Sequence, residues 1–291
     1  MGMLDGKVAI VTGAGGGIGR AHALLLAKEG AAVVVNDLGG ARDGTGASTS
    51  MADAVVDEII AGGGKAAANY GSVSDKAAAE SMVETAVSEF GRCDIMIANA
   101  GILRDKSFKN MDDEMWEVVL DVHLRGTYYT VKAAYDKMLE LGNGGRIIMT
   151  SSTSGLLGNF GQTNYGAAKA GIAGFMRCLW LEGLKYGVTV NVLAPTATSR
   201  LTEDILPEDI QDRFPPETVS PAIVWLCTDD AKDISGRQWL ISGNKVQLLS
   251  WQVTDIADRD LASGPWDVSD IGEKILASRE SWPPINPLRG A

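Results

Sequence analysis

The sequence predicts an α/β fold in which helices cover both faces of one parallel sheet of about seven strands. Short apolar runs alternate with helical patterns along most of the chain. These runs are apolar throughout, which is typical of strands that are buried on both faces. A glycine-rich loop also joins the first run directly to the first helical pattern, as in doubly wound sheets.

β-branched and aliphatic residues mark the predicted strands, and apolar residues that return every three or four positions mark the helices. The strands are residues 7–11, 32–35, 66–70, 95–98, 146–150, 189–193 and 238–241. The helices are residues 18–29, 50–61, 76–90, 112–141 and 164–186. Residues 39–47 carry glycines without periodicity and predict a loop, which is either a tolerated surface insertion or an element close to a bound cofactor.

The predicted sheet ends near residue 243, so we expect residues 1–243 to form a single domain that contains the catalytic site. Residues 244–291 hold three of the seven tryptophans, Trp251, Trp266 and Trp282. Because a large aromatic side chain buries ~150–250 Å², this C-terminal extension is expected to be ordered and to pack on the core or on a neighbouring subunit. It is too short to bury a core of its own.

Composition and charge favour a small-molecule partner. The formal net charge of −11 repels nucleic acid and anionic membrane surfaces. No apolar run approaches the ~18–20 residues that span a bilayer. The three cysteines are widely separated and only two histidines are present, so no metal site is expected. The N-terminal residues lack the pattern of a signal peptide, and we expect a cytoplasmic protein.

A loop with the pattern G-x-x-x-G-x-G runs through Gly13, Gly17, Ile18 and Gly19, between the first strand and the first helix. Free N–H groups at a helix N-terminus bind phosphate, and glycine lets a pyrophosphate approach the backbone. The loop predicts a dinucleotide site, the alternative being a tight turn without a ligand. Asp37 follows the second strand, where a carboxylate can accept hydrogen bonds from the adenosine ribose and repel a 2′-phosphate. This favours NAD over NADP, unless Asp37 only begins a turn.

Tyr165 and Lys169 lie four residues apart in a predicted helix and share one face. Tyrosine acts as a base near neutral pH only if its pKa falls by ~3 units, which needs ~4 kcal/mol of extra phenolate stabilisation. A nearby ammonium and an oxidised nicotinamide ring both contribute with that sign. Ser152 follows the fifth strand, at the sheet edge where ligands of such folds bind. The combination favours a catalytic set over an ordinary surface pair.

These motifs together resemble the short-chain dehydrogenase/reductase family over residues 5–243. The resemblance is carried by the glycine loop, Asn99-Ala100-Gly101, Ser152 and Tyr165-x-x-x-Lys169, in this order. The stretches VVVNDLGG, ANAGILRDKSF and NYGAAKAG are most similar to the (3R)-hydroxyacyl-CoA dehydrogenase units of peroxisomal multifunctional enzymes and their bacterial relatives. The resemblance implies a Rossmann fold, an oxidoreductase of lipid metabolism, and a homodimer or homotetramer.

The resemblance also implies roles for the matching residues. Tyr165 would be the general base in oxidation, Ser152 would hydrogen-bond the substrate oxygen, and Lys169 would lower the pKa of Tyr165 while binding the nicotinamide ribose. The remaining cofactor contacts would be Ser72 and Val73 near the adenine, Asn99, Ala100 and Gly101 along the groove, and Pro195 and Thr198 beside the nicotinamide.

Two positions depart from the family pattern. His123 stands where most members carry the asparagine that completes a catalytic tetrad, so it is either part of a proton relay or a packed histidine. Thr196 replaces the glycine that commonly follows the proline. The other histidine, His22, lies within the first predicted helix and is expected to be structural.

The sequence therefore predicts hydride transfer from a secondary alcohol to NAD, and the resemblance implies a (3R)-hydroxyacyl-CoA as the substrate. Arg104, Lys106 and Lys109 form either a patch for the CoA phosphates or a solvated face. One alternative substrate is a 17β-hydroxysteroid in an apolar pocket. The residues for that pocket are Leu156, Leu157, Phe160 and those around Leu201. An alternative of another class is a non-catalytic NAD-binding protein on the same fold.

Overall fold

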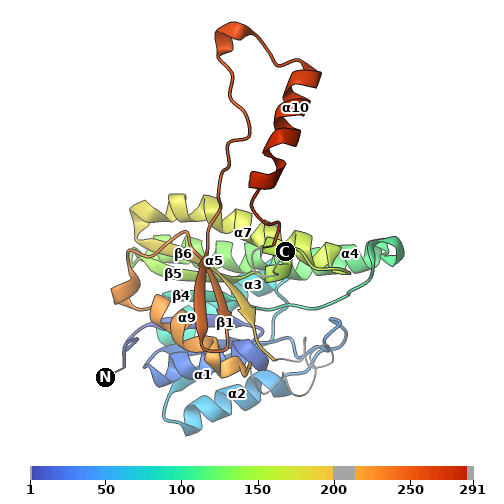
Figure 1. Ribbon diagram of the computed structural model, residues 1–291. Helices are drawn as coiled ribbons and strands as arrows, with labels where there is room; N and C mark the ends of the chain where they lie inside the picture. Colours follow the sequence, from blue (N-terminus) through green and yellow to red (C-terminus); the bar gives the residue numbers. More distant parts are fainter. Residues whose placement is uncertain (1, 199–213, 287–291) are drawn as a thin grey trace. The chain divides into compact units, whose positions relative to one another are not determined.

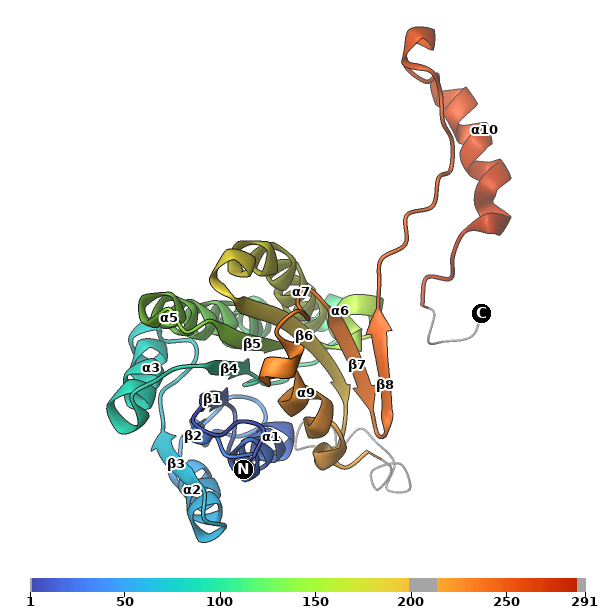
Figure 2. The same ribbon diagram turned by 90° about the vertical axis from the view of Figure 1, so that its left-hand side faces the viewer.

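The computed structural model describes residues 2–198 and 214–286. Figure 1 shows the fold of the chain. Within these ranges the strands form one sheet in the order β3-β2-β1-β4-β5-β6-β7-β8, and Figure 2 labels all eight. The strands are β1 (Val8–Thr12), β2 (Ala32–Asn36), β3 (Lys65–Asn69), β4 (Ile95–Ala98), β5 (Gly145–Thr150), β6 (Val188–Thr196), β7 (Gln238–Ser242) and β8 (Lys245–Leu249). Strands β1 to β7 pair in parallel, so the predicted doubly wound α/β fold is confirmed.

The sheet has one strand more than the seven predicted. Strand β8 runs antiparallel to β7, and Ser242 pairs with Lys245 across the Gly243-Asn244 turn. Gly243 has a φ of 55°, as the first residue of a tight hairpin turn requires. The prediction missed β8 because it took the change in composition after residue 243 as the end of the sheet. A Gly-Asn pair between two apolar runs was the available signal.

Helices cover both faces of the sheet (Figure 2). On one face lie α1 (Gly17–Lys28), α2 (Ser50–Ala61) and α9 (Ser220–Leu226), and on the other lie α3 (Lys76–Phe90), α5 (Gly126–Leu141) and α7 (Thr163–Gly183). Neighbouring strand residues contribute to different cores. Ala9 and Val11 pack toward the first set of helices, whereas Val8 and Ile10 pack toward the second. This alternation explains why the strands are apolar throughout.

The predicted helix over residues 112–141 is not one continuous α-helix. It consists of α4 (Asp113–Leu120) and α5, joined by a turn of π-helix over Asp121–Arg125. Single π-helical turns inside α-helices are frequent at functional sites. The turn contains His123, whose side chain is buried. Apolar periodicity alone does not reveal such a turn, because one inserted residue barely disturbs the pattern.

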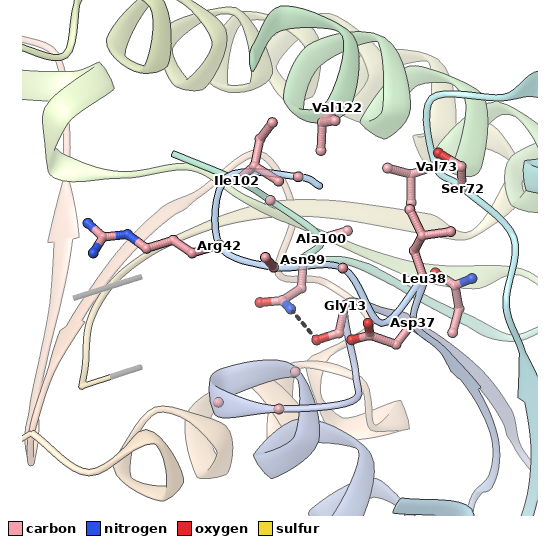
Figure 3. A pocket seen from close by; sticks show the side chains of 18 of the residues that line it. Gly13, Asp37, Leu38, Arg42, Ser72, Val73, Asn99, Ala100, Ile102 and Val122 are labelled. Carbon is pink, nitrogen blue, oxygen red and sulfur yellow. Dashed lines mark hydrogen bonds between the residues drawn. The ribbon is translucent and has the colours of Figure 1, made fainter. Parts of the chain in front are cut away.

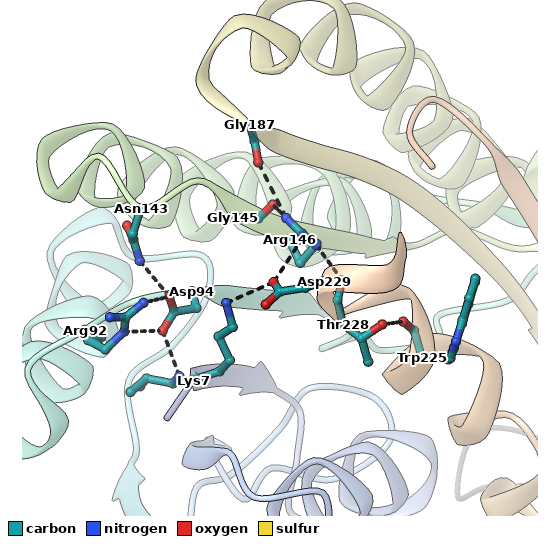
Figure 4. A network of polar contacts seen from close by, with 11 residues as sticks. Lys7, Arg92, Asp94, Asn143, Gly145, Arg146, Gly187, Trp225, Thr228 and Asp229 are labelled. Atoms are coloured by element: carbon teal, nitrogen blue, oxygen red, sulfur yellow. Dashed lines mark hydrogen bonds and ion pairs between the residues drawn. The ribbon is translucent and has the colours of Figure 1, made fainter. Parts of the chain in front are cut away.

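The edge of the sheet formed by the strand N-termini is closed by a polar network (Figure 4). Asp94 accepts hydrogen bonds from the backbone N–H of Val8 at 2.9 Å, from Arg92 Nε at 3.0 Å and from Asn143 Nδ2 at 2.6 Å. The buried Arg146 donates to the carbonyl oxygens of Gly145 and Thr228. These hydrogen bonds hold together the N-terminal ends of β1, β4 and β5.

The chain divides into two compact units, Met1–Leu249 and Ser250–Ala291. Within the second unit, α10 (Val268–Ser278) is capped by Asp267, which accepts a hydrogen bond from Ser269 N at 2.9 Å. Arg259 lies over the ring of Trp266 at 5.2 Å from its centre. The predicted packing of this extension on the core or on a neighbouring subunit stays a prediction. Across the described ranges, every helix is too short or too polar to span a bilayer.

His22 is buried where α1 meets α9, and its Nδ1 lies 2.8 Å from Ser220 Oγ. Burial lowers the pKa of His22 from its ordinary 6.5 to about 3. At a pH between these two pKa values, the unfolded chain binds a proton at His22 that the folded chain does not. The free energy of unfolding is therefore unaffected by this titration above about pH 6.5 and decreases as the pH falls below it.

We expect His22 alone to lower the free energy of unfolding by about 2 kcal/mol between about pH 7 and about pH 5. His22→Gln has no titrating ring and should show a smaller decrease over this range. Urea denaturation of both proteins at the two pH values measures the difference. Equal decreases in the two proteins would show that His22 does not titrate on unfolding.

Candidate active site

The glycine loop between β1 and α1 packs against the segment that follows β4. A Cβ atom at Gly13, which has a φ of 64°, would lie 2.8 Å from Ala100 Cα. A Cβ atom at Gly19 would lie 2.2 Å from Gly13 O and 2.6 Å from Asn99 Nδ2. Asn99 Nδ2 also donates to Thr12 O at 3.0 Å and to Gly13 O at 3.3 Å, the second bond being visible in Figure 3. Gly13 and Gly19 therefore leave no room for a side chain. The N–H groups in the first turn of α1 remain available to a phosphate.

Asp37 connects the end of β2 to the glycine loop. Its Oδ2 accepts a hydrogen bond from Gly15 N at 2.8 Å, and its Oδ1 accepts one from Gly39 N at 2.7 Å. The bond to Gly39 forms the turn that was the alternative role of Asp37 in the sequence analysis. The bond to Gly15 fixes the carboxylate against the phosphate-binding loop. Asp37 therefore both begins a turn and places a negative charge in the groove.

One pocket follows these loops along the carboxyl ends of β1, β2 and β4 (Figure 3). Predicted cofactor residues that line it are Gly13, Gly17, Ile18, Gly19, Asp37, Ser72, Val73, Asn99, Ala100 and Gly101. Residues that were not predicted also line it, among them Leu38, Gly40, Ala41, Arg42, Gly44, Ile102 and Val122. The loop over residues 39–47 thus lies at the cofactor groove, which was one of the two alternatives for it. The glycine loop and the carboxylate of Asp37 that line this pocket fit the phosphate and ribose groups of a dinucleotide.

Ser152, Tyr165 and Lys169 converge beyond the carboxyl end of β5. Ser152 precedes the short helix α6 (Thr153–Leu157), and its Oγ accepts a hydrogen bond from Ser154 N at 3.1 Å. Tyr165 and Lys169 lie in the first turns of α7. Lys169 Nζ donates to Thr150 O at 2.6 Å and lies 5.5 Å from the centre of the Tyr165 ring. The Ser152 hydroxyl lies close enough to Tyr165 to act on its pKa.

Burial dominates the protonation of this set. It raises the pKa of Tyr165 to about 12, the hydroxyl of Ser152 opposes the rise, and the charge of Asp105 adds to it. Burial also lowers the pKa of Lys169 to about 7. The protein groups alone therefore move the pKa of Tyr165 away from neutrality. Positive charge from an oxidised nicotinamide acts in the opposite direction.

The structure places His123 beside Tyr165. Their rings meet edge to face, with centroids 5.1 Å apart. His123 Nε2 lies 2.7 Å from Ile102 O and 3.1 Å from Ile102 N, and a Cβ atom at Gly101 would lie 2.3 Å from His123 Cε1. Burial holds the pKa of His123 well below its usual value, so the ring is neutral. His123 is thus a packed histidine in contact with Tyr165, and its part in a proton relay stays a prediction.

The remaining predicted residues lie outside the pocket of Figure 3. Pro195 lies near the end of β6, and Thr198 N donates to Phe214 O at 2.7 Å. Arg104 Nε donates to Asp43 O at 2.7 Å and so holds the loop after β2, whereas Lys106 and Lys109 are exposed.

The candidate apolar pocket for a steroid is only partly described. Leu156 and Leu157 are half-buried, but Phe160 is 90% exposed. Leu201 lies outside the described residues. Within the described ranges, no cluster of three histidine, cysteine or acidic residues could hold a metal ion.

Polar residues that the sequence did not single out fix the start of α7. Asn164 is buried, and its Nδ2 donates to Arg104 O and to Met115 O, each at 3.0 Å. Its Oδ1 accepts a hydrogen bond from Tyr165 N at 2.8 Å. Gln162 Nε2 donates to Asp105 Oδ2 at 2.7 Å. Their one sequence signal was proximity to Tyr165, because their partners lie in the distant segment that runs from Arg104 into α4.

Known proteins are similar to this chain in both sequence and fold. Residues 7–204 match the short chain dehydrogenase family. A short-chain type dehydrogenase/reductase of Mycobacterium tuberculosis is 47% identical over 98% of this chain and 96% of its own length. A crystal structure of a short chain dehydrogenase from Mycobacterium avium is 42% identical, covers 100% of both chains and superposes with a TM-score of 0.87.

Two further relatives belong to the subgroup that the sequence resembles, the multifunctional enzymes and hydroxyacyl-CoA dehydrogenases. Peroxisomal multifunctional enzyme type 2 of Mus musculus is 47% identical over 93% of this chain, which spans 37% of the mouse protein. A hydroxyacyl-CoA dehydrogenase of Mycobacterium tuberculosis is 40% identical over 85% of this chain and 80% of its own length. These similarities confirm the resemblance found in the sequence. The chain belongs to the short-chain dehydrogenase/reductase family of oxidoreductases, which act on CH–OH groups.

Proposed function

We propose that this chain oxidises (3R)-3-hydroxyacyl-CoA thioesters to 3-ketoacyl-CoA with NAD as the hydride acceptor. The observation that carries the proposal is the convergence of Ser152 and Tyr165 at the sheet edge that also bears the glycine loop and Asp37. Similarity to a hydroxyacyl-CoA dehydrogenase supports the substrate class. The acidic Asp37 in the groove supports NAD.

NAD, when bound, supplies the nicotinamide carbon that accepts the hydride. Tyr165 takes the proton of the substrate hydroxyl as the hydride leaves the carbon that bears this hydroxyl. Ser152 Oγ accepts the N–H of Ser154, which leaves its own hydroxyl hydrogen to donate to the substrate oxygen. General base catalysis of this kind contributes ~10²–10⁴-fold to the rate. In the reverse direction Tyr165 returns the proton to the alkoxide.

Asp37→Asn tests the choice of cofactor. The variant keeps a side-chain oxygen for one of the two backbone N–H donors but loses the negative charge that repels a 2′-phosphate. We expect the ratio of kcat/KM with NAD to that with NADP to fall by at least about tenfold. Asp57→Asn, which removes an exposed carboxylate from α2, is the matched control and should leave the ratio unchanged. An unchanged ratio in Asp37→Asn would contradict the NAD assignment.

Charge reversal at the exposed Lys106 and Lys109 tests the predicted CoA patch. The double variant Lys106→Glu/Lys109→Glu should raise KM for an acyl-CoA by about tenfold, because anionic side chains then face its phosphates. KM for the same acyl group on a truncated thioester without phosphates should not change. Lys28→Glu/Lys65→Glu reverses two exposed lysines elsewhere and serves as the control. Equal effects on both thioesters would show that the patch is a solvated face.

The alternatives have less support. The described part of the apolar pocket leaves Phe160 exposed, so little of it could enclose a steroid. Membership in a family of oxidoreductases, together with Ser152, Tyr165 and Lys169, disfavours a non-catalytic protein. A homodimer or homotetramer and a cytoplasmic location stay predictions from the sequence and the resemblance.

A further inference from the structure

Hydrogen bonds lead from Asp105 through the side chain of Gln162 to Ser154, whose backbone N–H makes the last link to Ser152. Asp105 Oδ2 accepts from Gln162 Nε2 at 2.7 Å. Gln162 Oε1 accepts from Ser154 Oγ at 2.7 Å and from Asn159 Nδ2 at 3.0 Å. Ser154 N then donates to Ser152 Oγ at 3.1 Å. This chain of hydrogen bonds therefore ends on the atom to which we assign the substrate oxygen.

The backbones of the two participating loops are also joined. Lys106 and Gln162 form an isolated parallel bridge, in which Lys106 N donates to Gly161 O at 3.0 Å. Asp105 lies in the loop that follows β4, and Gln162 immediately precedes α7. The contact therefore fixes the first turn of α7, which carries Tyr165, against the wall of the cofactor groove.

The carboxylate of Asp105 is incompletely satisfied by hydrogen bonds. Its side chain is half-buried, and its Oδ1 has neither exposed surface nor a hydrogen-bond donor among the described residues. Burial raises the pKa of this carboxyl, while the hydrogen bond from Gln162 and the charge of Arg42 oppose the rise. A buried carboxylate oxygen without a donor destabilises the fold, so its presence calls for a functional reason.

We propose that Asp105 is a positioning residue that fixes the orientation of the Gln162 amide and, through it, the hydroxyl groups next to the substrate. An ionised carboxylate only accepts hydrogen bonds, so it selects the NH₂ end of the amide. Gln162 must then present its oxygen to Ser154, whose hydroxyl donates to it. The Ser154 hydroxyl is then occupied by Gln162, and the single hydroxyl hydrogen of Ser152 stays available to the substrate oxygen. This inference rests on the proposed catalytic roles of Ser152 and Tyr165.

The negative charge of Asp105 also acts on Tyr165. Among the described residues, Lys169 from its own helix and His123 from the π-helical turn contact the Tyr165 ring. Asp105 from the loop after β4 acts on its pKa through charge. His123 is neutral, because burial holds its pKa well below the usual value. Asp105 is the one anion of the three, and its charge raises the pKa of Tyr165. Loss of that charge should therefore lower the pKa of the catalytic base.

The pH profile of kcat/KM for NAD-dependent oxidation separates the two effects. Asp105→Asn has no charge, so the acid limb should move to lower pH by about 0.5–1 unit. Its amide oxygen can still accept from Gln162 but no longer excludes the other amide orientation, so its plateau should lie between those of the wild type and Gln162→Leu. Gln162→Leu keeps the charge but breaks the hydrogen-bond chain. It should lower the plateau by about 10–100-fold without moving the limb to lower pH. Asp105→Leu should show both changes.

Asp113→Asn removes an exposed carboxylate at the start of α4 and should match the wild type throughout. An acid limb of Asp105→Asn at the wild-type pH, or a wild-type plateau in Gln162→Leu, would overturn the inference while leaving the proposed function intact. A residue that only stabilises the fold would lower the melting temperature and the plateau of Asp105→Asn without moving its limb. A wild-type protein that oxidises no secondary alcohol would instead contradict the proposed function itself.

Discussion

Tyr165→Phe is expected to lower kcat for alcohol oxidation by at least about 10²-fold while NAD affinity stays close to that of the wild type. The variant loses the hydroxyl that takes the substrate proton but keeps the ring, which meets His123 edge to face. Steady-state kinetics and calorimetric titration with NAD measure the two quantities. Tyr128→Phe removes the hydroxyl of a tyrosine in α5 that is 47% exposed, and it should keep normal kinetics.

The same variant tests the protonation of the site. A general base works only in its deprotonated form, so kcat/KM for oxidation should rise with pH through the pKa of Tyr165 in the presence of NAD. This pKa should lie below the value of about 12 that burial gives the residue in the protein alone. The rise should be absent from Tyr165→Phe. Near-normal turnover in that variant would mean that another group takes the proton.

Gly19→Ala is expected to raise the Kd for NAD by at least about tenfold, or ~1.4 kcal/mol. The added Cβ would lie 2.2 Å from the backbone oxygen of Gly13 and 2.6 Å from Asn99 Nδ2. Neither neighbour can move away easily, because Asn99 Nδ2 is itself bonded to Thr12 O and Gly13 O. The phosphate-binding loop must shift instead, and with it the N–H groups that face the groove.

Gly174→Ala is the matched control for this substitution. Gly174 also lies in a helix, α7, but a Cβ atom there meets no atom within 4 Å. The control should bind NAD normally and gain about 0.5–1 kcal/mol of stability, since alanine favours a helix over glycine. Normal NAD affinity in Gly19→Ala would show that the cofactor does not depend on this loop.

Local motifs made most of the fold and much of the site predictable. The glycine loop, Asp37 and Ser152 each follow a strand of the parallel sheet, and such positions meet at one edge whatever the details of packing. Tyr165 and Lys169 share a helix face by spacing alone. For the same reason the predicted strands coincide with β1 to β7 to within a few residues at their ends.

Features that depend on contacts between distant segments were not predictable. Asp105 and Gln162 meet only because two loops lie side by side, and neither residue belongs to a periodic pattern. The π-helical turn at His123 is hidden within a continuous helical pattern. The pKa of Tyr165 was expected to fall toward neutrality, but the sequence does not show the burial that raises it.

The most direct test of the proposed function is the initial rate of nicotinamide reduction with a (3R)-3-hydroxyacyl-CoA, its (3S) enantiomer and a 17β-hydroxysteroid, each with NAD and with NADP. We predict the highest kcat/KM for the (3R) thioester with NAD, because Asp37 places a negative charge in the cofactor groove. A higher kcat/KM for the hydroxysteroid, for the (3S) thioester or with NADP would contradict the proposal.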